Sequence, residues 1–269
     1  MINCSERNVV FMKVVLLAGG YGSRISEESY LKPKPMIEIG YRPIIWHIMK
    51  LYSYYGFNDF IICCGYKGHM IKEYFVNYYM QESDVTVNLQ EHSIDIHGTI
   101  AEPWKVTLVN TGIDTMTGSR IKQIRKYIGN DSFMLSYGDG VSNVNIKKLL
   151  DFHKSHGKTV TITSIQQASK FGVLCLSEDG LIQKFSEKPK QGGNWINGGF
   201  AVCENDIFQY IDDGDQVIME REPFEKVARE GQMMAYKHKG FWHPMDTMTD
   251  KRNLEAMWLE GNAPWKVWQ

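Results

Sequence analysis

A glycine-rich segment that ends in an arginine is the first part of the sequence with residue types suited to chemistry. Leu17 to Arg24 reads LAGGYGSR and directly follows the apolar residues from Val14 onward. Glycines at the carboxyl end of a strand let backbone N–H groups approach a phosphate closely, and this edge is where an open α/β sheet binds its ligands. The Arg24 guanidinium can bind phosphate oxygens in a bidentate manner. We interpret the segment as a loop for nucleotide phosphates; the alternative is a tight strand-to-loop turn.

A second cationic segment, Lys32 to Met36, follows the glycine loop and reads KPKPM. Its prolines fix φ and would hold Lys34 at low entropic cost. By itself such a segment suits a solvated basic turn, but together with Arg24 it concentrates positive charge in a chain whose net charge is -1. Local concentration of this kind predicts an anionic ligand. The loop has Ile25 at the third glycine position of a Rossmann dinucleotide motif and lacks the Gly-Lys-Ser/Thr of a P-loop, which makes a dehydrogenase a distant alternative.

Apolar runs alternate with helix-period segments from Lys13 onward. This pattern predicts an α/β fold with a Rossmann-like, mixed and mostly parallel sheet flanked by helices. Residues 85–111 show strand-like stretches without a helix between them, so we expect a β-rich excursion from the sheet there. Residues 1–11 are predicted to be an N-terminal extension. Residues 12–269 are predicted to form a single domain that ends in a helix and a Trp-containing tail, at about 248–269.

Composition narrows the class of protein. The 30 Lys and Arg residues balance 31 Asp and Glu residues, which argues against a nucleic-acid binder. No apolar run approaches the ~18 residues of a membrane span. The five cysteines include no C-x-x-C pair, and three of them lie in apolar runs, as buried thiols of a reducing cytosol would. The first eleven residues lack the pattern of a signal peptide. We therefore expect a cytoplasmic protein.

Further motifs make the chain similar to the sugar-nucleotidyltransferase family, and within it to the members that use CTP. Besides the two cationic segments, the motifs that carry the resemblance are Gly40 to Lys50, Ile61 to Gly68, Thr117 to Arg120, Tyr137 to Val141, Glu187 to Lys190, Ile196 to Phe200, Phe241 to Thr247 and Ala263 to Lys266. The resemblance runs from Met12 to the C-terminus. Tyr21 and Ser23 stand where Leu and Thr are familiar, and both changes are tolerable if the backbone binds the ligand.

The resemblance implies transfer of a cytidylyl group from CTP to α-D-glucose 1-phosphate, giving CDP-glucose and pyrophosphate. Two anions must meet, so catalysis would be mainly positioning and charge neutralisation. Arg24 and Lys34 match the family's catalytic cations, and Asp139 and Asp246 match its carboxylates for Mg²⁺. Two other functions remain as alternatives: a related nucleotidyltransferase that uses UTP, dTTP or GTP, and a regulatory subunit without catalytic activity.

The resemblance also assigns ligand contacts. The expected nucleotide-binding residues are Leu17, Ala18, Gly19, Gly20, Tyr21, Gly22, Ser23, Arg24, Lys34, Thr115, Arg120 and Gly138. The expected sugar-phosphate residues are Glu187, Lys188, Asn197 and Gly198. From the residues alone, Arg120 could read the edge of cytosine or be a solvated residue on a helix face.

The resemblance finally implies a homo-oligomer, because the family assembles as hexamers. Trp265 and Trp268 follow the last expected helix. This tail could bury against a neighbouring subunit or fold back on its own domain.

Overall fold

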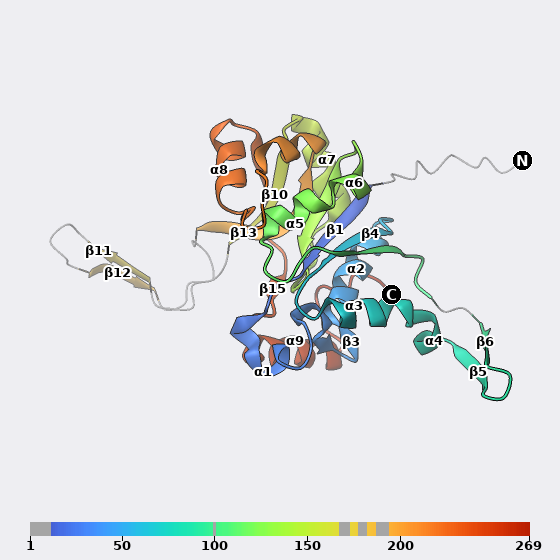
Figure 1. The fold of residues 1–269 in the computed structure, drawn as a ribbon. Coiled ribbons are helices and arrows are strands. Elements are labelled where there is room, and N and C mark those ends of the chain that lie inside the picture. Colours follow the sequence, from blue (N-terminus) through green and yellow to red (C-terminus); the bar gives the residue numbers. More distant parts are fainter. Residues whose placement is uncertain (1–11, 99–100, 167–172, 177–181, 187–193) are drawn as a thin grey trace, which may run out of the picture.

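A twisted seven-stranded sheet forms the centre of the computed structural model, which describes residues 12–98, 101–166, 173–176, 182–186 and 194–269 (Figure 1). In spatial order its strands are β14 (Met233–His238), β10 (Val160–Gln166), β13 (Trp195–Cys203), β8 (Phe133–Tyr137), β1 (Lys13–Ala18), β4 (Asp59–Cys64) and β7 (Lys105–Asn110). Strand β13 runs antiparallel to both of its neighbours, and the other adjacent pairs are parallel. The predicted mixed, mostly parallel sheet is confirmed.

The register of the central strands brings three strand ends to one edge. Leu17 of β1 lies level with Cys63 of β4 and with Tyr137 of β8. The glycine loop that follows β1 therefore emerges beside the turn that begins at Gly138. This edge is the place where an open α/β sheet can build a ligand site from its loops.

Helices cover both faces of the sheet, because successive side chains of a buried strand such as β1 point to opposite faces. Residues of one core cluster come from α2 (Ile44–Tyr54), α3 (Gly68–Val76), α7 (Ile146–His156) and α9 (Met248–Leu259). Residues of the other cluster come from α5 (Thr117–Gln123), α6 (Arg125–Ile128), the 3₁₀ helix η3 (Asn205–Tyr210) and α8 (Glu222–Arg229). Both clusters include residues of β1, which is thus buried on its two sides.

Shorter elements lie outside the sheet. Their bounds are η1 (Ser23–Ile25), α1 (Ser26–Ser29), η2 (Lys34–Met36), β2 (Glu38–Ile39), β3 (Arg42–Pro43), α4 (Tyr78–Glu82), β5 (Asp84–Asn88), β6 (Ser93–His97), β9 (Gly140–Ser142), β11 (Val173–Leu176), β12 (Ile182–Ser186) and β15 (Trp242–Pro244). β11 and β12 pair as antiparallel strands. Among the helices of the described residues, none has the length and hydropathy needed to cross a membrane.

The expected β-rich excursion is smaller than predicted. β5 and β6 pair with each other and project from the body of the molecule (Figure 1). β7, however, pairs in parallel with β4 and forms an edge of the main sheet, so the assignment of residues 105–110 to the excursion was wrong. A half-exposed edge strand and a hairpin strand have the same alternating pattern, and that pattern does not reveal which strand is the partner.

The C-terminal tail folds back on its own chain. The exposed fractions of Trp265 and Trp268 are 1% and 9%. The ring of Trp268 packs edge-on against Trp46, and the ring of Trp265 lies against His47, both on α2. Burial of the tail therefore requires no neighbouring subunit, and these tryptophans give no support to oligomerisation.

Candidate active site

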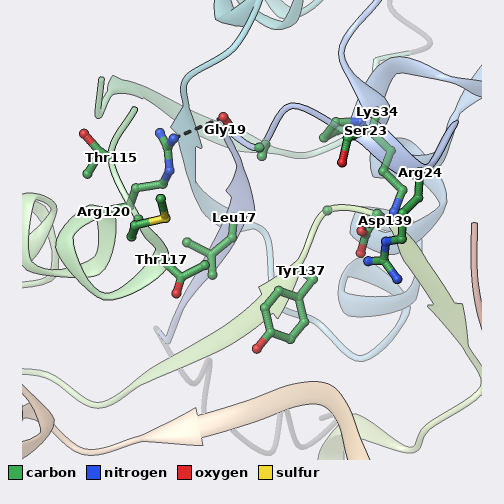
Figure 2. A pocket seen from close by; sticks show the side chains of 16 residues that line it. Leu17, Gly19, Ser23, Arg24, Lys34, Thr115, Thr117, Arg120, Tyr137 and Asp139 are labelled. Atoms are coloured by element: carbon green, nitrogen blue, oxygen red, sulfur yellow. Dashed lines mark hydrogen bonds and ion pairs between the residues drawn. The ribbon is translucent and has the colours of Figure 1, made fainter. Parts of the chain in front are cut away.

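A cavity of about 290 Å³ lies at the carboxyl edge of β1 and β8 (Figure 2). Its lining consists of Leu17, Ala18, Gly19, Gly20, Gly22, Ser23, Arg24, Lys34, Pro35, Thr115, Met116, Thr117, Arg120, Tyr137, Gly138 and Asp139. All the residues expected to bind nucleotide line it except Tyr21, whose half-exposed side chain donates a hydrogen bond to Asp114 at 2.5 Å. Gly22 has a φ of +66°, which a glycine adopts without steric penalty.

One lysine and one arginine side chain contact two aspartates at this cavity. The Lys34 ammonium lies 2.7 Å from Asp139 Oδ2 and 2.6 Å from Asp246 Oδ1. Arg24 Nη1 lies 2.6 Å from Asp246 Oδ2. The Lys34 side chain is only 8% exposed, whereas that of Arg24 is 71% exposed, so Lys34 is the fixed cation of the group and Arg24 the accessible one. Both carboxylates thus reach a single point, which their separation in the sequence does not reveal.

Strand pairing explains how Asp246 reaches Asp139. Asp139 stands between β8 and β9, and Asp246 follows β15. β9 and β15 pair antiparallel, and the Met245 N–H donates to the Asp139 carbonyl at 2.9 Å. The N-cap of α9 is Thr247, which forms a capping box with Asp250. The Asp246 carboxylate is therefore free of capping and binds the two cations.

Lys34 owes its position to the prolines around it. It begins the 3₁₀ helix η2, with Pro33 as the extended N-cap residue and Pro35 directly after it. Pro35 lines the cavity. Lys34 is buried, and the exposed fraction of the whole residue is 6%. A burial this deep requires charged partners, and the two aspartates supply them.

Arg120 is buried at the opposite end of the cavity, with an exposed fraction of 4%, so the solvated-residue alternative was wrong. Its Nη1 donates to Thr111 Oγ1 at 2.6 Å and to the Gly112 carbonyl at 2.7 Å. Its Nη2 donates to the carbonyls of Gly19 and Ile113, each at 3.1 Å. A guanidinium has five N–H groups, so at most one donor of Arg120 remains for a ligand while these bonds persist.

The residues expected to bind the sugar phosphate are only partly described. Glu187 and Lys188 lie outside the described residues. Asn197 and Gly198 lie on β13, next to the cavity rather than in its lining. Asn197 Nδ2 donates to the Tyr137 hydroxyl at 3.3 Å, which connects this part of β13 to the cavity wall.

Sequence reasoning missed several residues of the cavity, among them Thr117 and Tyr137. Both stand within motifs that carried the family resemblance, and Tyr137 directly precedes the predicted Gly138 and Asp139. The signal available was position: a polar side chain at the last residue of a central strand lies at the ligand edge of the sheet.

The fold and the site define the class of protein, and sequence comparison agrees. The chain belongs to the nucleotidyl transferase family, which it matches over residues 13–256. It is 51% identical to the glucose-1-phosphate cytidylyltransferase of Salmonella typhi, over 96% of this chain and 100% of the relative. It is 42% identical to the probable glucose-1-phosphate cytidylyltransferase of Bacillus subtilis, with the same coverage of both chains. The family resemblance predicted from the motifs is confirmed.

Solved structures support the fold independently. A UDP-glucose pyrophosphorylase complexed with UDP-glucose superposes with a TM-score of 0.67 at 19% identity, covering 94% of this chain and 100% of the other. HddC from Yersinia pseudotuberculosis gives a TM-score of 0.67 at 22% identity, covering 92% and 100%. The overall fold is thus shared with chains of very different sequence.

Proposed function

We propose that this protein transfers the cytidylyl group of CTP to α-D-glucose 1-phosphate, releasing pyrophosphate and CDP-glucose. The observation that carries the proposal is the group of ion pairs that Arg24 and Lys34 form with Asp139 and Asp246 beside the glycine loop. It occurs in a chain that matches a Salmonella typhi cytidylyltransferase over that relative's whole length at 51% identity. A regulatory subunit without catalytic activity would not need these four charged residues at the cavity.

The reaction needs no nucleophilic side chain. An oxygen of the sugar phosphate forms a bond to the α-phosphorus of CTP, and the bond from that phosphorus to the pyrophosphate oxygen breaks. Backbone N–H groups of Leu17 to Gly22 bind phosphate oxygens of CTP, while Arg24 and Lys34 neutralise the charge that develops at the α-phosphate. Arg24, which is largely exposed, can leave Asp246 for a phosphate without breaking a buried contact.

We infer that Asp139 and Asp246 hold Mg²⁺. The residues fit this ion, since two carboxylates converge on one point that a cationic ammonium now shares. Within the described residues, no group of three or more His, Cys, Asp or Glu side chains gathers to hold a metal. Mg²⁺ commonly takes one or two carboxylates and completes its shell with water and substrate phosphates. When bound, it would supply charge neutralisation to the phosphates, and Lys34 would pass from the aspartates to the nucleotide.

Sugar binding is assigned to Glu187, Lys188, Asn197 and Gly198 on the strength of the family resemblance. A carboxylate accepts hydrogen bonds from sugar hydroxyls, and an ammonium binds the sugar phosphate as a point charge. The contact of Asn197 with a cavity residue supports a sugar position on the β13 side of the nucleotide.

The remaining proposals concern organisation and location. We propose that residues 12–269 act as one domain behind an N-terminal extension of residues 1–11, and that the protein is a cytoplasmic homo-oligomer. Cys63 and Cys203 are buried free thiols, and burial raises the pKa of each to about 12. Unpaired, unreactive cysteines of this kind suit a reducing compartment.

Metal dependence is tested with the purified protein, CTP and glucose 1-phosphate, by following pyrophosphate release. We expect the rate to vanish in excess chelator and to return with Mg²⁺ or Mn²⁺. Asp139→Asn and Asp246→Asn should each lower the rate and raise the metal concentration needed for half-maximal activity. Full rate in excess chelator would contradict the metal assignment.

A further inference from the structure

Glu220 lies behind the cavity wall and binds two side chains that form it. The Tyr137 hydroxyl donates to Glu220 Oε1 at 2.5 Å, and the Thr117 hydroxyl donates to Glu220 Oε2 at 2.6 Å. Tyr137 and Thr117 both line the cavity, whereas Glu220 does not. The carboxylate therefore acts on the cavity through these two hydroxyl groups.

The direction of each hydrogen bond follows from the chemistry of the groups. A carboxylate only accepts, so the Tyr137 proton is directed at Glu220. Asn197 Oδ1 accepts the Gly199 N–H at 2.8 Å, which leaves Asn197 Nδ2 as the donor to the Tyr137 oxygen at 3.3 Å. Because the Tyr137 hydroxyl already donates its hydrogen to Glu220, it can only accept a hydrogen bond from any further partner. The Asn197 amide is a distant donor at 3.3 Å, so the phenol oxygen can still accept from a ligand group that donates.

The segments that contact Tyr137 and Glu220 are held in place by packing and by backbone hydrogen bonds. A Cβ at Gly199, whose φ is +70°, would lie 3.0 Å from Cδ2 of the Tyr137 ring, so the backbone of β13 packs directly on that ring. The segment before α8 is tied to the start of α5, because the Gly118 N–H donates to the Val217 carbonyl at 2.8 Å. The Met219 N–H also donates to the Thr117 hydroxyl, at 2.9 Å.

The position of Tyr137 points to the sugar rather than to the base. Tyr137 ends β8, two residues before Asp139, and its ring lies across the cavity from Gly19 and Thr115 (Figure 2). Its hydrogen bond to Asn197 joins it to β13, the side on which the proposed function puts the hexose. A hexose hydroxyl can donate a hydrogen bond to the Tyr137 oxygen, which is held in place as an acceptor.

We propose that Tyr137 accepts a hydrogen bond from a hydroxyl of the hexose of glucose 1-phosphate, and that Glu220 is the positioning residue that orients Tyr137 for this contact. The inference rests on the proposed function for the identity of the sugar. A ribose hydroxyl of the nucleotide is the other group with the same chemistry, and the kinetic constants of the two substrates distinguish the two sources.

The test compares Tyr137→Phe with wild type, using CTP, glucose 1-phosphate and the deoxyglucose 1-phosphates that lack one hydroxyl each. Tyr54→Phe, which removes a hydroxyl from a half-exposed tyrosine of α2, is the matched control. We expect Tyr137→Phe to raise the KM for glucose 1-phosphate about tenfold, with the KM for CTP within about twofold of wild type. One deoxy sugar should be a poorer substrate than glucose 1-phosphate for wild type, yet equal to it for the variant.

Glu220→Gln tests the positioning role, because it keeps the shape of the side chain but adds a donor that competes with the Tyr137 proton. We expect a smaller rise in the KM for glucose 1-phosphate, and the double variant with Tyr137→Phe should be no worse than Tyr137→Phe alone. Circular dichroism and thermal unfolding establish that each variant folds.

Each contrary result identifies what failed. A rise in the KM for CTP alone would assign Tyr137 to the ribose and overturn the inference. Unchanged constants for both substrates in Tyr137→Phe would overturn it as well, and an unchanged KM in Glu220→Gln would remove the positioning role. If wild type forms no product from glucose 1-phosphate with any nucleoside triphosphate, the proposed function is what fails.

Discussion

Replacing Lys34 by methionine should slow the reaction and, at the same time, tighten metal binding by the free protein. The Lys34 ammonium contacts both Asp139 and Asp246, at 2.7 and 2.6 Å, and therefore occupies the point that a shared divalent cation requires. Methionine has a similar length and removes the charge without leaving a large void. Metal no longer has to displace an ammonium from the two carboxylates.

The two effects differ in origin and in size. Loss of a cation at the developing charge of the transition state lowers the rate by about 10²–10³. Two unit charges at ~4 Å attract by about 1 kcal/mol in water and about 4 kcal/mol at an effective dielectric constant of ~20. The Asp139 and Asp246 side chains are 33% and 22% exposed, which places the competition between these two values. A gain of about 1.4 kcal/mol corresponds to about tenfold tighter metal binding.

Mn²⁺ titration of the protein without nucleotide, followed by electron paramagnetic resonance, measures the second effect separately from turnover. Lys32→Met is the matched control, because it removes the same charge from the same segment while its own partner is Glu38. The Mn²⁺ affinity of Lys34→Met should rise and that of Lys32→Met should stay near wild type. Equal affinities for wild type and Lys34→Met would refute the reasoning, and an equal rise in both variants would reduce it to a general charge effect.

Variants of three other residues test further parts of the structure and of the proposed site. Burial lowers the pKa of His47 to about 4 from an ordinary 6.5, so between these pH values the unfolded chain binds a proton that the folded chain does not. The free energy of unfolding should therefore fall by up to about 3 kcal/mol as the pH drops from 6.5 to 4. Denaturant titrations should show a flatter pH profile for His47→Gln than for wild type. Gly19→Ala should lower the melting temperature, because its Cβ would lie 2.2 Å from Arg120 Nη1, whereas Gly20→Ala, with open space around its Cβ, should melt like wild type; equal melting would contradict the packing. Glu187→Ala should raise the KM for glucose 1-phosphate and leave that for CTP nearly unchanged, and steady-state kinetics showing an effect on CTP alone would withdraw the assignment.

Local pattern was enough to predict the centre of the fold and the glycine loop that lines the cavity. The apolar run of β1 is buried on both faces, so its residues mark a central strand without knowledge of its partners. The glycine loop and Asp139 follow two strands that turn out to be adjacent, and in a parallel sheet such strand ends share one edge. Lys34 was found because prolines fix its backbone.

Contacts between distant segments could not be predicted from local pattern. Asp246 reaches Asp139 only through the pairing of β9 with β15, and neither of these three-residue strands has a recognisable period. Arg120 is buried because three carbonyls from two loops surround its guanidinium, and its sequence neighbours Lys122 and Arg125 give no sign of this. Glu220 lies in a connection before α8, and its role depends on hydroxyls contributed by two other elements.

The most direct test of the account is a comparison of nucleotides. The purified protein is incubated with Mg²⁺, glucose 1-phosphate and, separately, CTP, UTP, dTTP, GTP and ATP, and both pyrophosphate and the sugar nucleotide are measured. We predict efficient formation of CDP-glucose with CTP and much slower product formation with the other four. Preference for another nucleotide, or no product with CTP while the protein remains folded, would contradict the proposed function.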